Sequence, residues 1–225
     1  MYQRFIYDEM PGAFNVALNT MPDLESYLLN MDDDQIGNPD DPEVKRLQML
    51  MNKTILGSKL WKDLENSTKT VYFKFHNSRN PKDIVGVYLF YVANAKAETM
   101  TLRDYNYIKG NGQSPPDSSD KDYTFNKETG LYDKTAEWDK TVIAFDIHSI
   151  KQRGLTEVVV NQFNEDIDKG IEIAWIDVTA HEIQHAVNQS YADLYKPYEE
   201  RINEIEGREI GKKVKDELIK IYKSK

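Results

Sequence analysis

The chain contains no cysteine, and this absence limits both its cross-linking and the metal sites it can form. Without thiols no disulfide can brace the fold, and the cysteine-rich class of structural zinc site is excluded. A zinc ion would have to be held by histidine and carboxylate groups. Because a cysteine-free chain tolerates reducing and oxidising surroundings alike, this feature leaves the cellular compartment open.

Long apolar runs are also lacking. The longest of them, Ile84–Val92, is far too short to cross a bilayer. Residues 1–14 hold no apolar segment of the kind that marks a signal peptide. We therefore expect a soluble protein with neither a membrane span nor a signal peptide.

The chain has fewer basic than acidic residues: it contains 29 Lys and Arg and 38 Asp and Glu, and its net charge is −9. This balance argues against nucleic acid as the main partner. The charge is uneven: residues 1–45 carry ten acidic and two basic side chains, whereas residues 207–225 carry seven basic and three acidic ones. We interpret the basic C-terminal stretch as a solvated helix face, with membrane or nucleic-acid contact as the alternative.

The chain divides into two regions of different character. With 225 residues and 40% apolar content, it can bury one substantial core. Residues 1–42 are acidic and interrupted by four prolines, so they are predicted to form an N-terminal extension, and residues 43–225 the domain. Asp32 to Glu43 has a spacing similar to that of a calcium loop, but Ile36 occupies a ligand position, and an ordinary acidic loop is predicted.

Hydrophobic periodicity predicts one amphipathic helix over residues 43–65. Four strands are predicted after it, over residues 70–76, 84–92, 141–147 and 155–160, with a turn at 77–82 joining the first two as a hairpin. Residues 110–139 are rich in Gly, Pro, Ser and Asp and are predicted to form a long loop.

Two helices are predicted in the C-terminal part. Asp177 or Thr179 can cap the first, which continues to about Gln189, and Pro197 fits the first position of the second, which runs to about Tyr222. The sequence thus predicts an α+β domain with a small, mainly antiparallel sheet, an N-terminal helix and a pair of C-terminal helices.

The most informative segment is His181-Glu182-Ile183-Gln184-His185, an HExxH pentapeptide inside the first of these helices. Histidines four apart project from one face of a helix and can bind one metal ion. Glu182 would lie near a water on that ion, where a general base is needed. The alternative is a surface helix with two incidental histidines.

A third ligand has to come from downstream, and Glu204 is the best candidate. It begins a stripe of residues spaced three and four apart on the second helix: Glu204, Gly207, Gly211, Val214, Leu218 and Ile221. The two glycines predict a close approach of the helices, which would bring this carboxylate to a metal held by the first helix. Glu200, one turn earlier, is the alternative, and Glu206 is predicted to point elsewhere.

An HExxH motif followed by Glu204-Ile205-Glu206-Gly207, 19 residues beyond His185, resembles the gluzincin-type zinc metallopeptidases and their zincin-like fold. The order of a helix before the strands, and of a strand at 141–146 before the motif, is similar to compact metallopeptidase effector and toxin domains of bacteria. The resemblance covers about residues 43–210. Many gluzincins have Asp or Asn four residues after the ligand glutamate, but this chain has Arg208, so Asp177 and Asp146 become the candidates for orienting a metal histidine.

The resemblance implies a zinc-dependent endopeptidase with one Zn²⁺ per chain, held by His181, His185 and Glu204. It also implies that Glu182 acts as the general base on a protein or peptide substrate. The second group that stabilises the oxyanion would come from the stretch between the ligand helices, with Tyr198 preferred among Tyr191, Tyr195, Tyr198 and Arg201.

Three functional hypotheses stay open at this point. The first is an effector or toxin exported by a dedicated secretion system, with a cognate immunity or inhibitor protein as a second partner. The second is a housekeeping metallopeptidase of the cytoplasm, and the third is a zinc-stabilised interaction module without catalysis. Glu182 argues against the third, because a purely structural site needs no base. His76 and His148 are predicted to be structural or surface residues, and Trp61, Trp138 and Trp175 to line the core or a cleft.

Overall fold

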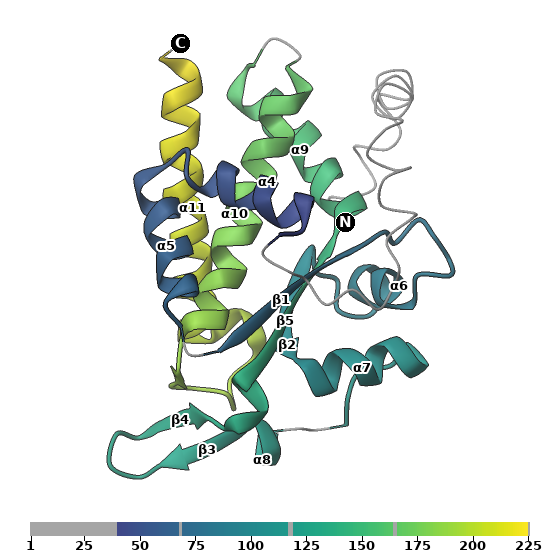
Figure 1. The fold of residues 1–225 in the computed structure, drawn as a ribbon, viewed down its shortest axis with the longest axis vertical. Helices are drawn as coiled ribbons and strands as arrows, with labels where there is room; N and C mark the ends of the chain where they lie inside the picture. Colours follow the sequence, from purple (N-terminus) through teal and green to yellow (C-terminus); the bar gives the residue numbers. More distant parts are fainter. Residues whose placement is uncertain (1–39, 68, 117–118, 164–165, 225) are drawn as a thin grey trace. The chain divides into compact units, whose positions relative to one another are not determined.

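The computed structural model describes residues 40–67, 69–116, 119–163 and 166–224 (Figure 1). Residues 1–39, which make up nearly all of the predicted extension (1–42) and most of the segment with calcium-loop spacing, lie outside this range. Of that segment, Asp41 caps α4, and Pro42 and Glu43 belong to the helix. The described elements, in chain order, are α4 (Pro42–Met51), α5 (Ile55–Glu65), β1 (Thr70–His76), α6 (Ile84–Tyr91), β2 (Ala97–Thr101), α7 (Leu102–Asn111), α8 (Ser119–Asp122), β3 (Tyr123–Asn126), β4 (Leu131–Lys134), η1 (Ala136–Asp139), β5 (Lys140–Asp146), α9 (Ile147–Asn161), α10 (Ile167–Val187), β6 (Ser190–Tyr191), η2 (Tyr198–Glu200) and α11 (Ile202–Lys223).

The larger sheet has the strand order β1-β5-β2, in which β5 runs parallel to β1 and antiparallel to β2. Being central, β5 is covered on both faces, and Val142 to Phe145 are fully buried. This double burial explains why the strand is continuously apolar from Val142 to Phe145 instead of alternating. The predicted strands at 70–76 and 141–147 are confirmed.

A smaller sheet, β3-β4-β6, is antiparallel throughout. The α+β class with small, mostly antiparallel sheets is therefore as expected.

Residues 84–92 were predicted to be a strand, and this prediction is wrong. They form helix α6, whose first turn is capped by Asp83, which accepts a hydrogen bond from the N–H of Gly86. The predicted hairpin at 77–82 is wrong for the same reason. A short apolar run is compatible with a buried strand or a buried helix, and the capping aspartate decides between them here.

Three further predictions need correction. The strand predicted at 155–160 belongs to α9, capped by Asp146, and its β-branched Val159 and Val160 are largely exposed near the helix end. The predicted loop 110–139 contains the β3–β4 hairpin and the short helices α8 and η1. The single helix predicted over 43–65 is two, because the Thr54 hydroxyl accepts a hydrogen bond from the N–H of Gly57 and starts α5 afresh.

The two C-terminal helices exist, but their predicted starts are wrong. α10 begins at Ile167 and is capped by Asp166, so Asp177 and Thr179 lie well inside it. α11 begins at Ile202, whereas Pro197 precedes the 3-10 turn η2. The motif is consequently held in the last turns of a 21-residue helix.

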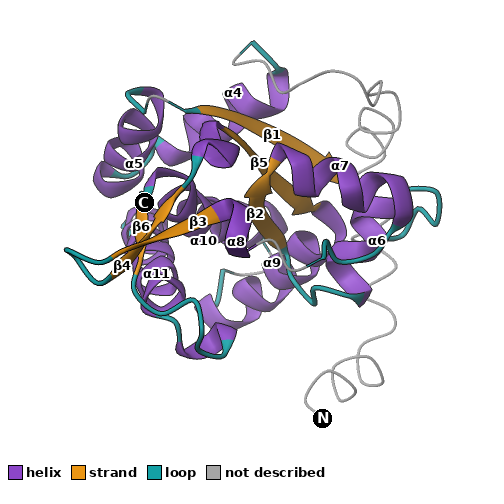
Figure 2. Cartoon of the chain, turned by 90° about the horizontal axis from the view of Figure 1, so that it is seen from below, coloured by secondary structure: helices purple, strands orange, loops and turns teal. Residues whose placement is uncertain are grey.

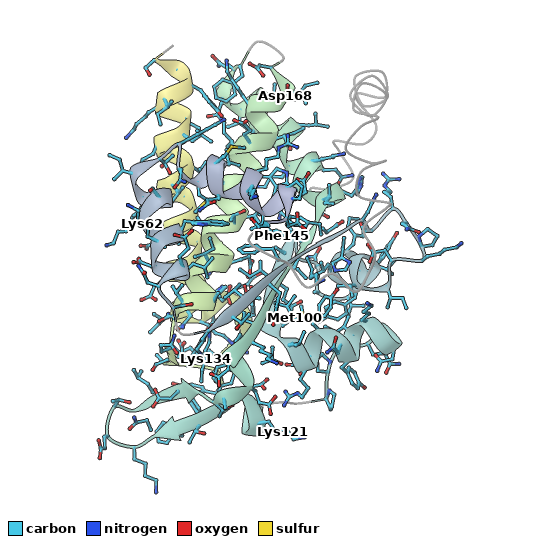
Figure 3. All side chains as sticks on the ribbon, in the orientation of Figure 1. Lys62, Met100, Lys121, Lys134, Phe145 and Asp168 are labelled. Carbon is cyan, nitrogen blue, oxygen red and sulfur yellow. The ribbon has the colours of Figure 1, made fainter. Side chains whose placement is uncertain are left out.

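Helix α10 lies at the centre of the main core. It packs with α4, α5, α9 and α11 and with one face of the larger sheet, while α6 and α7 cover the other face (Figure 2). Phe145 lies inside this core, whereas Lys62 and Asp168 are at the surface (Figure 3). Trp61 and Trp138 are buried and Trp175 packs against the core, as predicted. Within the described ranges, no helix combines the length and the apolar character needed to cross a membrane.

Candidate metal centre

The two motif histidines lie one turn apart on α10 and their rings converge. The Nε2 atoms of His181 and His185 are 2.9 Å apart, and the two rings are inclined by 74°. His185 is buried and His181 is half-buried. Four-residue spacing on a helix produces this convergence, because positions i and i+4 share one face.

Glu204, in the first turn of α11, completes the cluster. Its Oε1 lies 3.2 Å from Nε2 of His185, and its Oε2 lies 3.4 Å from Nε2 of His181. These three side chains are the group of potential metal ligands found within the described residues, with their ligand atoms all within 4.8 Å of one another. Glu200 and Glu206 are both exposed, so Glu204 is the glutamate that this fold brings to the histidines.

The spacing of the three groups fits a tetrahedral zinc ion. Bonds of about 2.0–2.1 Å at tetrahedral angles place neighbouring ligand atoms about 3.3 Å apart. The observed separations of 2.9, 3.2 and 3.4 Å lie around this value. In addition, Oε2 of Glu204 is buried without a hydrogen-bond partner. A cation would satisfy a buried carboxylate oxygen of this kind. Two histidines and one carboxylate form a donor set that suits zinc.

The electrostatics of the cluster favour a negative carboxylate. Burial acts to raise the pKa of Glu204, but the adjacent imidazoles of His181 and His185 outweigh it and hold that pKa well below its usual range. Burial also acts to lower the pKa of His181, and it is overcome by the hydrogen bond to Glu204 and the charge of Glu182, so the pKa of His181 is raised. Both shifts favour the charged forms of this pair, a carboxylate on Glu204 and a protonated imidazole on His181.

Glycines on α11 allow the two helices to approach closely. A β-carbon at Gly207 would lie 3.2 Å from three atoms of the His181 ring, and one at Gly211 would lie 2.7 Å from the backbone oxygen of Asp177. Glu204, Gly207, Gly211, Val214 and Leu218 are all buried, which confirms the predicted stripe except for the half-buried Ile221. Because Gly207 meets His181 and the later Gly211 meets the earlier Asp177, α11 runs antiparallel to α10.

Glu182 points from α10 towards the edge strand β2. Its Oε2 accepts a hydrogen bond of 2.7 Å from the hydroxyl of Thr99, and its side chain is 6% exposed. The carboxylate is thus held on the same helix as the two candidate metal-binding histidines without belonging to the candidate ligand group. Nothing in the sequence around Thr99 signals this contact, because the partner lies 83 residues away.

Among the four proposed oxyanion donors, Tyr198 interacts with Glu204 through its hydroxyl. Burial, followed by the charge of Glu204 and a hydrogen bond with that carboxylate, raises the pKa of the hydroxyl, although the residue is 57% exposed. Tyr191 is buried, and its pKa is raised by burial and then by the charges of Glu204 and Glu182. Tyr195 is 76% exposed, and Arg201 donates to the backbone oxygen of Lys196.

Two buried charged side chains near the site were not identified from the sequence. Burial, followed by the charge of Glu182, raises the pKa of Glu98 to about 7, and Oε2 of Glu98 has no hydrogen-bond partner. Lys134 donates to the backbone oxygen of His185, and burial lowers its pKa to about 6. Its ammonium group lies 4.1 Å from the centre of the Trp138 ring. Glu98 lies on β2, a strand that was not predicted from the sequence, and Lys134 lies on β4, within the predicted loop 110–139. No sequence pattern therefore indicated either residue.

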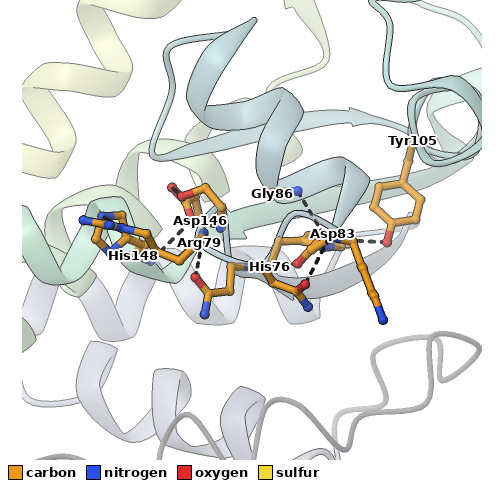
Figure 4. A network of polar contacts seen from close by, with 11 residues as sticks. His76, Arg79, Asp83, Gly86, Tyr105, Asp146 and His148 are labelled. Carbon is orange, nitrogen blue, oxygen red and sulfur yellow. Dashed lines mark hydrogen bonds and ion pairs between the residues drawn. The ribbon is translucent and has the colours of Figure 1, made fainter. Parts of the chain in front are cut away.

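The other histidines belong to a structural network (Figure 4). His76 is buried between the carboxylate of Asp83 and the hydroxyl of Tyr105, and His148 contacts Arg79. This agrees with their predicted structural role. Asp146 caps α9, and so does not serve the metal histidines.

Comparisons with known proteins yield no relative: no family model matches the chain, and neither a curated protein nor a solved structure does. Inference about function therefore rests on the geometry of the cluster and on the chemistry of its side chains.

Proposed function

We propose that this protein is a zinc-dependent endopeptidase with its active site at the His181–His185–Glu204 cluster. The observation that carries the proposal is the meeting of side chains from two helices, α10 and α11. Two histidines of α10 and a carboxylate of α11 converge at zinc spacing, and a second buried carboxylate, Glu182, lies beside them without joining the ligand set. A structural zinc site would use a fourth protein ligand and would need no base.

Each of these side chains has a specific role in the proposed reaction. His181, His185 and Glu204 would hold one Zn²⁺, which as a Lewis acid polarises the peptide carbonyl and lowers the pKa of a water to about 7. Glu182 would take a proton from a water as its oxygen bonds to the peptide carbonyl carbon, and would deliver that proton to the nitrogen that leaves when the C–N bond breaks. The hydrogen bond from Thr99 fixes the carboxylate for both transfers. Tyr198 donates a hydrogen bond to the developing oxyanion.

The resemblance to zincin-like bacterial effector and toxin domains adds three hypotheses that stay predictions. These are export to a target cell, a cognate immunity or inhibitor protein, and a protein substrate within that cell. A housekeeping peptidase of the cytoplasm would use the same side chains. The interaction-module alternative is weakened by the placement of Glu182, because a binding module gains nothing from a buried carboxylate next to its metal.

The test of the proposal is cleavage of an unbiased, proteome-derived peptide library by the zinc-loaded protein, with products identified by mass spectrometry. Glu182→Gln is the matched control, because it keeps size and hydrogen bonding but removes the base. We expect wild type to cut internal peptide bonds and Glu182→Gln to leave the library intact while binding zinc. Equal product patterns from wild type and Glu182→Gln would contradict the assignment, and so would an untouched library with fully zinc-loaded wild type.

A further inference from the structure

A group of four charged side chains joins α9, α10 and α11 at a distance from the metal cluster. Arg153 of α9 is ion-paired with Asp177 of α10. Lys215 of α11 lies 3.2 Å from Glu157 of α9 and 3.7 Å from Asp177. The Nε of Arg153 is 3.9 Å from Glu157. Two cations and two carboxylates therefore alternate around one junction, where Figure 1 shows the three helices side by side.

This junction is largely shielded from water. The side chains of Glu157, Asp177 and Lys215 are 11%, 12% and 18% exposed, and that of Arg153 is 33% exposed. Buried ion pairs contribute little net stability, because desolvation offsets their attraction, but breaking one of them leaves an uncompensated charge. Such a group therefore discriminates between alternative helix registers more strongly than apolar contacts do.

Asp177 links this group to the metal ligands. It lies one turn before His181 on α10, and its backbone oxygen is at the point where Gly211 lets α11 approach. Lys215 follows Gly211 by one turn and lies eleven residues, or about 16 Å of helix, beyond Glu204. The contacts Glu204–His181, Gly211–Asp177 and Lys215–Asp177 thus follow one another along the two antiparallel helices.

A slip of α11 by one turn would have two consequences together. It would bring Glu200 or Arg208 to the histidines in place of Glu204, and it would move Lys215 about 5.4 Å from its two carboxylate partners. Val214 and Leu218 are apolar side chains whose packing is not directional, so they oppose such a slip less strongly. The charged group therefore adds to the two glycine contacts as a part of this interface that distinguishes one register from the next.

We infer that Arg153, Glu157, Asp177 and Lys215 are positioning residues that fix the register of α11 on α10 and so present Glu204 to the metal held by His181 and His185. None of the four makes a side-chain hydrogen bond to His181, His185 or Glu204 in the described part of the chain. The charge of Asp177 acts on His181 directly, so Lys215→Met is the variant that isolates the effect carried by the helix pair. The inference rests on the proposed metal centre and goes beyond it, since it assigns a role to residues remote from the reaction.

The test compares metal binding by Asp177→Asn and Lys215→Met with binding by wild type and by Asp122→Asn. The last variant is a matched control: Asp122 is a buried aspartate at the end of α8, and it is paired with Arg103 of α7, an arginine as exposed as Arg153. This pair joins α7 and α8 and takes no part in the α10–α11 interface. Zinc affinity is measured by competition with a chromophoric chelator. The cobalt-substituted proteins give a second readout, because their visible spectrum reports the ligand set. Glu204→Ala supplies the spectrum of the site without its carboxylate.

We expect Asp177→Asn and Lys215→Met each to bind zinc about 10- to 100-fold more weakly, the range typical of residues that orient metal ligands. Their cobalt spectra should shift towards that of Glu204→Ala. The losses of zinc affinity in the two single variants should not add in the variant that combines Asp177→Asn with Lys215→Met. A purely structural role would lower thermal stability and leave the spectrum unchanged. If Asp177→Asn does not fold, Lys215→Met, which keeps the aliphatic stem, decides the question.

Two failures are distinguishable. If wild type binds zinc tightly and both variants match Asp122→Asn in affinity and in cobalt spectrum, the positioning role is overturned while the metal centre stands. If wild type binds no better than Glu204→Ala, the metal centre itself fails and the positioning role fails with it.

Discussion

The imidazole of His181 rests against the bare backbone of Gly207: a β-carbon at that glycine would be 3.2 Å from Nδ1, Cε1 and Nε2 of the ring. Such a distance is tighter than ordinary contact, so Gly207→Ala must push the ring or the helix aside. We expect zinc affinity to fall at least several-fold, measured by chelator competition. Helix propensity alone would have favoured alanine by about 1 kcal/mol.

Gly110→Ala is the control for this substitution. Gly110 also lies in a helix, α7, but a β-carbon there would meet nothing within 4 Å. This variant should gain roughly 0.4–1 kcal/mol in its free energy of unfolding and bind zinc like wild type. Equal zinc affinity for Gly207→Ala and Gly110→Ala would mean that the close approach at Gly207 does not govern the position of His181.

The hydrogen bond from Thr99 to Glu182 can be separated from metal binding. Thr99→Val removes the hydroxyl and keeps the branched shape, so the carboxylate loses the partner that orients it. General-base catalysis contributes about 10²- to 10⁴-fold, and a misplaced base forfeits part of this. We expect kcat/KM to drop about tenfold with zinc affinity unchanged, while Glu182→Gln loses nearly all activity. An unaltered kcat/KM for Thr99→Val would show that Thr99 does not orient the Glu182 carboxylate for catalysis.

Tyr198→Phe tests the second donor to the oxyanion. The hydroxyl interacts with Glu204, yet over half of the residue is exposed, so losing the hydroxyl should disturb neither folding nor zinc binding. We predict a fall in kcat of about 10²-fold with KM nearly constant, because the donor acts on charge that develops in the transition state. A change confined to KM would place Tyr198 in substrate binding instead.

Glu98 should make stability depend on pH. Burial, then the charges of Glu182, Asp104 and Glu204, raise its pKa from 4.5 to about 7, so the folded state prefers the neutral carboxyl. Between these two values the folded state binds more protons than the unfolded one, and this contribution to stability falls as pH rises. Glu98→Gln should therefore stabilise the protein at pH 8, by an amount on the order of 2 kcal/mol.

The same variant provides its own control through pH. At pH 4, where Glu98 is protonated in both states, wild type and Glu98→Gln should unfold at nearly the same denaturant concentration. Chemical denaturation at pH 4, 6 and 8 measures the difference directly. A difference independent of pH would show that Glu98 is not held neutral in the folded state.

The residues of the candidate metal site were predicted from the sequence more accurately than the helices and strands were. His181, His185 and Glu204 were predictable because helical spacing is local and because Gly207 and Gly211 mark the close face of α11. The strand predicted at 84–92 became a helix because a short apolar run has no distinctive period, and the cap at Asp83 was the signal that was overlooked.

Contacts made over a long sequence separation explain the other residues that the sequence did not reveal. Thr99 reaches Glu182 only after β2 has paired at the sheet edge, and Lys134 reaches His185 only after the β3–β4 hairpin has formed. Asp177 was identified from its position alone, and its partners Arg153 and Lys215 lie on two other helices. Side-chain partners of this kind depend on tertiary packing, which no local pattern encodes.

The most direct test of the central claim is the zinc content and affinity of the purified wild-type protein beside Glu204→Ala and Glu182→Gln. The account predicts about one zinc per wild-type chain, a large loss of affinity in Glu204→Ala because a buried ligand is gone, and full retention in Glu182→Gln. If wild type takes up no zinc after reconstitution, or if Glu204→Ala holds it as tightly, the cluster is not a metal centre and the proposed peptidase chemistry is wrong.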